Sequence, residues 1–167
     1  RYRLWINGRP VLSGPLKGDQ WRQYYETIDV SNTIRPGLNC IGVKVIAYPA
    51  YETKTTGNPT PLSIVSNGAG PQLMVDGILR SGKGRMLADV TTGYGDWYVT
   101  LDRATKWISC RDASSPGAME KVDGNRVPQG WQNAPKPEGD WSLAETLWTA
   151  AGDASDIDYG IIPPMPL

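Results

Sequence analysis

The chain contains no histidine and no phenylalanine, and only two cysteines among its 167 residues. Without histidine, the chain alone cannot form a Ser-His-Asp or Cys-His catalytic site or a His-ligated metal site. Basic and acidic residues each number 17, so the formal net charge is zero. A neutral chain has no overall electrostatic attraction for nucleic acid or anionic lipid, and we expect neither as a partner.

Long hydrophobic runs are also missing. No stretch of about 18 apolar residues occurs, so we expect no membrane-spanning segment. The N-terminus has no apolar signal core and opens on an alternating run typical of a strand already under way. We therefore expect the chain to be a piece of a longer polypeptide. The two cysteines, Cys40 and Cys110, allow either one disulfide or two free thiols, and the sequence leaves both open.

Alternating apolar and polar residues are abundant, and 19 glycines and 14 prolines separate the alternating runs. Residues 2–6 alternate up to Asn7 and Gly8, a pair typical of a hairpin turn because both residues tolerate positive φ. Further strands are predicted over residues 24–30, 40–48, 72–75, 97–101 and 106–108. A capping box formed by Ser142 and Glu145 predicts one short helix over residues 142–148.

Many short strands with glycine and proline turns predict an all-β fold, namely an antiparallel β-sandwich or jelly roll of the galactose-binding type, with at most one short helix. We expect residues 1–160 to form this domain. Residues 161–167 are rich in proline and are predicted to be a linker toward a following domain.

A glycine-rich segment has nearly the spacing of a phosphate-binding loop. Gly77, Gly82 and Lys83 match the pattern, but Gly84 stands where serine or threonine is required, and no helix former follows. We interpret the segment as a glycine-rich turn.

Clustered carboxylates raise two further hypotheses. Asp153, Asp156 and Asp158 are hard oxygen ligands that suit calcium, but their spacing differs from an EF-hand and favours a solvated acidic loop. Glu120 and Asp123 are candidates for a glycosidase pair, which requires two acids at a defined separation. A structural role, in which Arg126 pairs with an acid, is the alternative.

Tryptophan and tyrosine are the most informative residue types. Their flat rings suit the apolar faces of sugars, whereas the alternative is that they fill the core in place of phenylalanine. The aromatic residues near strand ends or in loops are Trp21, Tyr24, Tyr25, Trp97, Tyr98, Trp107, Trp131, Trp141 and Trp148.

Several stretches, in this order, resemble the N-terminal β-sandwich domain of bacterial and fungal α-L-rhamnosidases, glycoside hydrolase family 78. The matching stretches are residues 2–8 (YRLWING), 24–30 (YYETIDV), 34–39 (IRPGLN), 97–101 (WYVTL) with Trp107, 119–126 (MEKVDGNR), and Gly130-Trp131 with Trp141. The resemblance covers nearly the whole chain and implies that the first strand of the family's sandwich is absent here.

In that family this domain precedes an α/α barrel that carries the catalytic acid and base. The resemblance therefore implies that the chain is a non-catalytic accessory domain of a glycoside hydrolase, and that its partners are an L-rhamnose-containing glycan and the catalytic domain of the same polypeptide. Some members bind L-rhamnose here through calcium, so calcium is a candidate ligand. Residues 47–51 (AYPAY) depart from the family's Gly-Trp-Tyr-Gly stretch, and we assign no calcium ligands. A secreted enzyme fits this class, although the compartment stays open.

The candidate site residues fall into two groups. Possible sugar platforms are Trp21, Tyr25, Tyr48 and Tyr51. Polar or stacking groups at a site or a domain interface are Glu120, Asp123, Arg126 and Trp131. The alternatives are a purely structural bracing domain, a stand-alone sugar-binding module, and a self-contained enzyme that uses Glu120 and Asp123.

Overall fold

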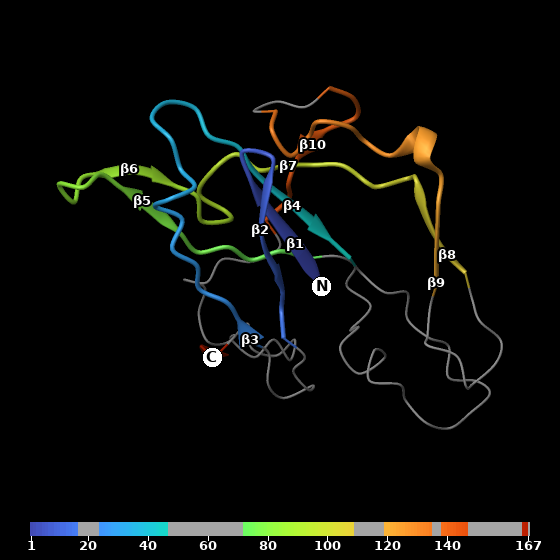
Figure 1. Ribbon diagram of the computed structural model, residues 1–167, viewed down its shortest axis with the longest axis horizontal. Helices are drawn as coiled ribbons and strands as arrows, with labels where there is room; N and C mark the ends of the chain where they lie inside the picture. Colours follow the sequence, from blue (N-terminus) through green and yellow to red (C-terminus); the bar gives the residue numbers. More distant parts are fainter. Residues whose placement is uncertain (17–23, 47–71, 109–118, 135–137, 147–164, 167) are drawn as a thin grey trace.

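The computed structural model describes residues 1–16, 24–46, 72–108, 119–134, 138–146 and 165–166. This part of the chain consists of strands (Figure 1), and its one helical element is a short 3-10 turn, η1 (Gly124–Arg126). The strands are β1 (Tyr2–Ile6), β2 (Arg9–Gly14), β3 (Tyr24–Tyr25), β4 (Ile41–Val45), β5 (Ile78–Arg80), β6 (Met86–Asp89), β7 (Tyr98–Val99), β8 (Thr105–Ile108), β9 (Met119–Val122), β10 (Ser142–Leu143) and β11 (Met165–Pro166).

The strands pair into small sheets. One has three strands in the order β2-β1-β4, and four have two strands each, namely β10-β7, β11-β3, β5-β6 and β8-β9. All of these pairs are antiparallel except β11 with β3. The predicted all-β, antiparallel character is therefore confirmed. The arrangement of the sheets as a sandwich or jelly roll stays a prediction.

The central sheet is organised by the predicted hairpin turn. Asn7 and Gly8 have φ values of 52° and 80°, the left-handed conformation that a tight hairpin turn requires. The turn pairs β1 with β2, and β4 adds to the other edge of β1. Ile6, at the end of β1, is only 2% exposed, so the turn directly adjoins the small core.

The Asn7 side chain ties distant segments to this turn. Its Oδ1 accepts from the backbone N–H of Cys40 at 3.0 Å, and its Nδ2 donates to Asn39 Oδ1 at 2.9 Å. The next backbone N–H, of Gly8, donates to the carbonyl of Gln132 at 2.9 Å. The turn thus holds both the start of β4 and the loop around residue 132.

Trp131 packs on one face of the central sheet. Its ring lies edge-on to Trp5, with ring centroids 5.2 Å apart and planes at 74°. Gly42 on β4 is paired with Trp5, and a Cβ at Gly42 would lie only 2.9 Å from Cζ3 of Trp131. The glycine therefore leaves the space that the indole ring fills.

Of the other predicted strands, some are present in the structure and one is absent. The predictions over residues 40–48, 97–101 and 106–108 are confirmed in their central parts by β4, β7 and β8. Residues 24–30 form a strand only at β3, because the chain then turns, with the backbone N–H of Thr33 and Ile34 both bonded to the carbonyl of Val30. The strand expected over residues 72–75 is wrong, and β5, β6 and β9 were not predicted.

The helix predicted to begin at Ser142 is also wrong. Ser142 and Leu143 form β10 and pair with Val99 and Tyr98 of β7. The backbone N–H of Ala144 extends this pairing by donating to the carbonyl of Trp97 at 2.7 Å. Long-range pairing has overridden the local capping pattern, and residues 147 and 148 lie outside the described residues.

The glycine-rich turn is confirmed. Residues 81–84 connect β5 to β6, and the backbone N–H groups of Ser81 and Gly84 bond to Arg85 and Ser81. No helix follows, so the segment lacks the context of a phosphate-binding loop. Figure 1 shows the β5-β6 hairpin and the β8-β9 ribbon on opposite sides of the central sheet.

The sequence left open whether Cys40 is a free thiol, and it predicted a linker over residues 161–167. Cys40 is a half-buried free thiol whose Sγ donates to the carbonyl of Ala134 at 3.3 Å, and burial raises its pKa. Cys110 lies outside the described residues. Within the expected linker, Met165 and Pro166 form β11 beside Tyr24 and Tyr25.

Candidate functional site

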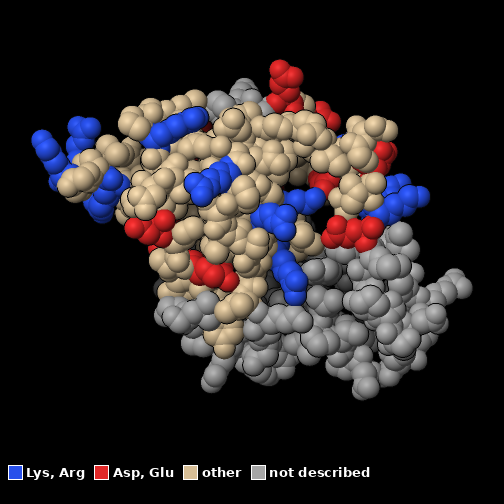
Figure 2. Space-filling view, in the orientation of Figure 1, with Lys and Arg blue, Asp and Glu red and all other residues tan. Residues whose placement is uncertain are grey.

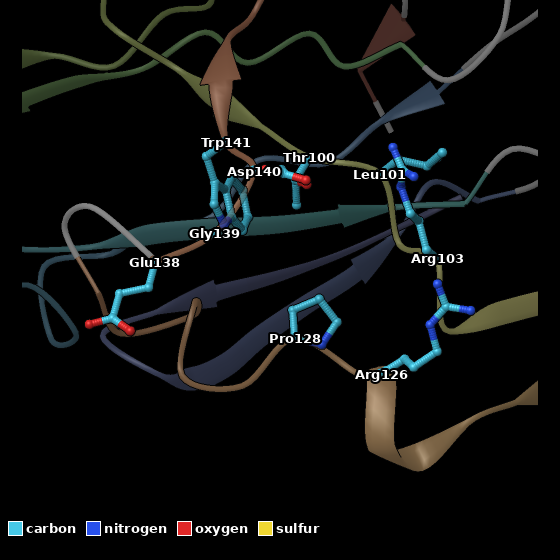
Figure 3. A pocket seen from close by; sticks show the side chains of 9 residues that line it. All are labelled: Thr100, Leu101, Arg103, Arg126, Pro128, Glu138, Gly139, Asp140 and Trp141. Carbon is cyan, nitrogen blue, oxygen red and sulfur yellow. The ribbon is translucent and has the colours of Figure 1, made fainter.

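An open cavity of about 340 Å³ lies where the end of β7, the turn η1 and the start of β10 meet (Figure 3). We call it the Trp141 cavity. Its lining residues are Thr100, Leu101, Arg103, Arg126, Pro128, Glu138, Gly139, Asp140 and Trp141. They come from three separate stretches of the chain, so the cavity exists only once these stretches are folded together.

Strand pairing brings two of these stretches together. Val99 of β7 is paired with Ser142 of β10 in an antiparallel register. The residues just after β7 therefore lie opposite those just before β10, which places Thr100 beside Trp141. Gly139 has a φ of +108°, and the N–H of Trp141 donates to its carbonyl at 2.9 Å. This tight turn directs Asp140 and Trp141 to the cavity wall.

The cavity combines an aromatic ring with charges of both signs. Trp141 is half-buried, and its ring centroid lies 6.3 Å from that of Trp131. In Figure 3, Glu138, Asp140 and Trp141 lie on one side of the cavity, and Arg103 and Arg126 lie on the other. A flat ring beside hydrogen-bond donors and acceptors is the combination that binds the apolar face and the hydroxyls of a sugar.

A second cavity, of about 250 Å³, adjoins the first and shares Arg103 and Arg126 with it. We call it the basic cavity. Its other lining residues are Ala104, Lys106, Lys121 and Asp123. Four cationic side chains and one carboxylate thus line it, whereas the chain as a whole is neutral.

Asp102 organises the segment that carries Arg103. Its carboxylate accepts from Lys44 Nζ at 2.7 Å, from Thr105 Oγ1 at 2.8 Å and from the backbone N–H of Ala104 at 2.8 Å. Desolvation raises the pKa of Asp102, but these hydrogen bonds and the charge of Lys44 outweigh it and lower the pKa to about 2. Asp102 is therefore ionised and engaged with Lys44.

Two predicted site residues line the cavities. Arg126, in η1, lines both of them, and Asp123 lines the basic cavity. Asp123 also caps η1, because its Oδ1 accepts from the N–H of Asn125 at 3.1 Å. Asp123 and Arg126 thus both contribute to the basic cavity, while their role in binding stays a prediction.

The other candidates lie elsewhere. Trp131 packs against Gly42 and Trp5 and lines neither cavity. Tyr25 lies on β3, 39% exposed, far from β7 and β10 in Figure 1. The predictions for Trp21, Tyr48 and Tyr51 lie outside the described residues.

Glu120 and Asp123 do not form a glycosidase pair. Both lie on extended chain, with Glu120 on β9 and Asp123 directly after it at φ −88° and ψ 102°. Successive side chains on extended chain point to opposite faces, so residues three apart face opposite sides of the ribbon. On regular extended chain the two carboxylates would therefore point to opposite faces rather than toward a common substrate.

Sequence reasoning missed most of the Trp141 cavity. Trp141 stood in the aromatic set, but Arg103, Glu138 and Asp140 carried no motif. A predicted pairing of β7 with β10 would have brought these residues together. The capping-box pattern at Ser142 instead predicted a helix where β10 lies.

The described residues contain no group of three or more His, Cys, Asp or Glu side chains able to hold a metal ion. The acidic cluster of Asp153, Asp156 and Asp158 lies outside them. Within the same part of the chain, no helix has the length and apolar character needed to cross a membrane.

Comparison of the chain with protein-family models, with curated proteins and with solved structures finds no match in any of the three.

Proposed function

We propose that this chain is an accessory carbohydrate-binding domain and that the Trp141 cavity holds the sugar. The observation that carries the proposal is the joint presence, in the lining of one open cavity, of Trp141, of the acidic residues Glu138 and Asp140, and of the basic residues Arg103 and Arg126. The ring offers an apolar face to a pyranose, and the charged groups offer strong acceptors and donors to its hydroxyls.

The sequence resemblance adds the class of glycan and the setting. It points to L-rhamnose-containing glycans and to a parent glycoside hydrolase whose catalytic residues lie in another domain.

Titration calorimetry tests the proposal on the full chain. We expect rhamnosyl oligosaccharides to bind, and Trp141→Ala to weaken the Kd about tenfold, since the lost ring contact is worth roughly 1.4 kcal/mol. Tyr94→Ala is the matched control, because Tyr94 is an aromatic residue that is 73% exposed and lines neither cavity. Equal affinity in a folded Trp141→Ala variant would contradict the proposal.

A bracing role is the second candidate function. Apolar side chains on and beside the β7-β10 pair are exposed, namely Val99 at 46%, Leu101 at 69% and Leu143 at 56%. Exposed apolar groups of this kind occur at contacts between domains. If bracing is the only role, the unaltered chain binds no glycan in the calorimeter.

A further inference from the structure

The β8-β9 ribbon places two lysines directly opposite each other. Lys106 on β8 is the register partner of Lys121 on β9, and both side chains are exposed. Partners in an antiparallel pair project from the same face of the ribbon. Like charges at such positions repel each other, so this pair is unfavourable unless something of opposite charge lies between or beside them.

The surroundings add positive charge rather than neutralising it. Arg103 and Arg126 complete the wall of the basic cavity, where Asp123 is the only carboxylate among the described lining residues. One oxygen of Asp123 already accepts the N–H that caps η1. Among the residues described, the only ion pair within 4.0 Å joins Lys44 to Asp102, and it includes none of these four cations.

The four cations surround a hollow rather than a flat surface. The cavity holds about 250 Å³, and Ala104 beneath it is only 2% exposed. Guanidinium groups bind carboxylate or sulfate oxygens through paired hydrogen bonds, and ammonium groups add point charges. The site therefore has the chemistry of a receptor for one compact oxyanion.

We propose that the basic cavity binds the anionic group of an acidic glycan, a uronate carboxylate or a sulfate ester, while a neighbouring sugar of the same glycan lies against Trp141. This inference rests on the proposed function and names its substrate class. The shared residues support it, because Arg103 and Arg126 line both cavities, so the two cavities adjoin and one glycan can reach both.

The same geometry disfavours a nucleic acid as the ligand. Glu138 and Asp140 line the adjoining cavity and repel a continuous chain of phosphates. A glycan that is charged on one unit and neutral on the next matches the order of the two cavities, cationic in one and mixed in the other.

The test compares matched oligosaccharides by calorimetry on the full chain. One is a neutral rhamnosyl oligosaccharide, the second carries a uronic acid unit, and the third carries a sulfate ester. We expect at least one acidic form to bind tenfold or more tightly than the neutral form in low salt. The combined variant Lys106→Gln and Lys121→Gln is expected to remove this preference while leaving the Kd of the neutral oligosaccharide unchanged.

Lys83→Gln is the matched control variant. Lys83 is exposed in the β5-β6 turn near Arg80 and Arg85 in the sequence, so its substitution removes one positive charge outside both cavities. The preference for the acidic glycan should survive this substitution. If Lys83→Gln lost the preference as fully as the combined variant does, the inference would be overturned. Non-specific electrostatic attraction between the protein and the acidic glycan would then explain the binding.

The remaining outcomes separate the inference from the proposed function. Equal binding of the neutral and both acidic oligosaccharides overturns the acidic-glycan site and leaves the sugar-binding function intact. Binding of none of them overturns both. Tighter binding of a single-stranded oligonucleotide than of either acidic oligosaccharide overturns the assignment to glycans. A preference for the uronate over the sulfate, or the reverse, supports the site and identifies the anion.

Discussion

Single half-buried polar residues hold the loops of this protein in place. Glu26 accepts from the hydroxyl of Tyr2 at 2.5 Å and from the backbone N–H of Leu16 at 2.9 Å. Burial and the neighbouring Glu26 raise the pKa of Tyr2 well above its usual range. Asp102 holds the segment that leads into β8 in a similar way, because its carboxylate accepts hydrogen bonds from Lys44, Ala104 and Thr105. Each contact replaces water by a protein partner at a loop that lacks regular structure.

Asp102 makes stability depend on pH in the acidic range. Its pKa is lowered from 3.8 to about 2, so its contribution is complete above pH 4 and is lost as the pH falls toward 2. Asp102→Asn should lower the free energy of unfolding at pH 7 by roughly 1 kcal/mol, a value discounted for partial exposure. Urea unfolding at a series of pH values measures this effect.

The unaltered chain should lose more stability between pH 4 and pH 2 than Asp102→Asn does. Asp96→Asn is the control, since Asp96 is an exposed carboxylate. Identical slopes for the unaltered chain and Asp102→Asn in this range would refute the role assigned to Asp102.

At the scale of elements, short strand pairs position the candidate site. The β7-β10 pair brings Trp141 to Thr100, and β8-β9 brings Lys106 to Lys121. Both pairs are short, so side-chain interactions across them weigh heavily in their stability. An unfavourable cross-strand pair within such an element is therefore a measurable cost to folding.

Lys121→Glu should stabilise the protein in low salt. The substitution places opposite charges across the ribbon in place of like charges, which favours the folded state by roughly 0.5 kcal/mol. The gain should shrink as salt screens the pair. Chemical denaturation at two salt concentrations measures both effects, and Lys83→Glu serves as the control for the change in net charge. A destabilised Lys121→Glu variant in low salt would be evidence against repulsion between the two lysines.

At the scale of the whole molecule, the described core is small and the surface is mixed in charge. Ile6 and Ala104 are the fully buried apolar residues of the described part. Basic and acidic side chains are interspersed over the face shown in Figure 2, in keeping with the neutral total. Because this core is so small, the edge-on contact of Trp131 with Trp5 and its packing over Gly42 join the loop around residue 131 to the central sheet.

Gly42→Ala tests the importance of this packing. The added Cβ would lie 2.9 Å from Cζ3 of Trp131 and 3.3 Å from the backbone Cα of Gln132, so the loop must shift. We expect the free energy of unfolding to fall by about 1–3 kcal/mol. Thermal unfolding followed by tryptophan fluorescence measures the loss. Gly124→Ala is the control, because nothing lies within 4 Å of its added Cβ. Equal stabilities of the two variants would show that the ring moves aside freely.

Sequence reasoning succeeded where the cause was local. The alternation of residues 2–6 and the turn residues Asn7 and Gly8 predicted the β1-β2 hairpin, because pleat and positive φ are properties of adjacent residues. It failed at Ser142, where a local helix signal competed with a strand partner more than forty residues away in sequence. It also missed β9, which pairs with β8 in an antiparallel register.

The all-β character, the neutral charge, the exclusion of histidine chemistry and the central hairpin all follow from the order of the amino acids. Which aromatic residue faces a cavity depends instead on how distant segments pack together. Trp131 fills the space above Gly42, whereas Trp141 lines the open cavity. The reason is that side-chain type and spacing fix local conformation, while burial depends on which distant segments pair. Arg103, Asp140 and Trp141 become neighbours only through the register of β7 with β10.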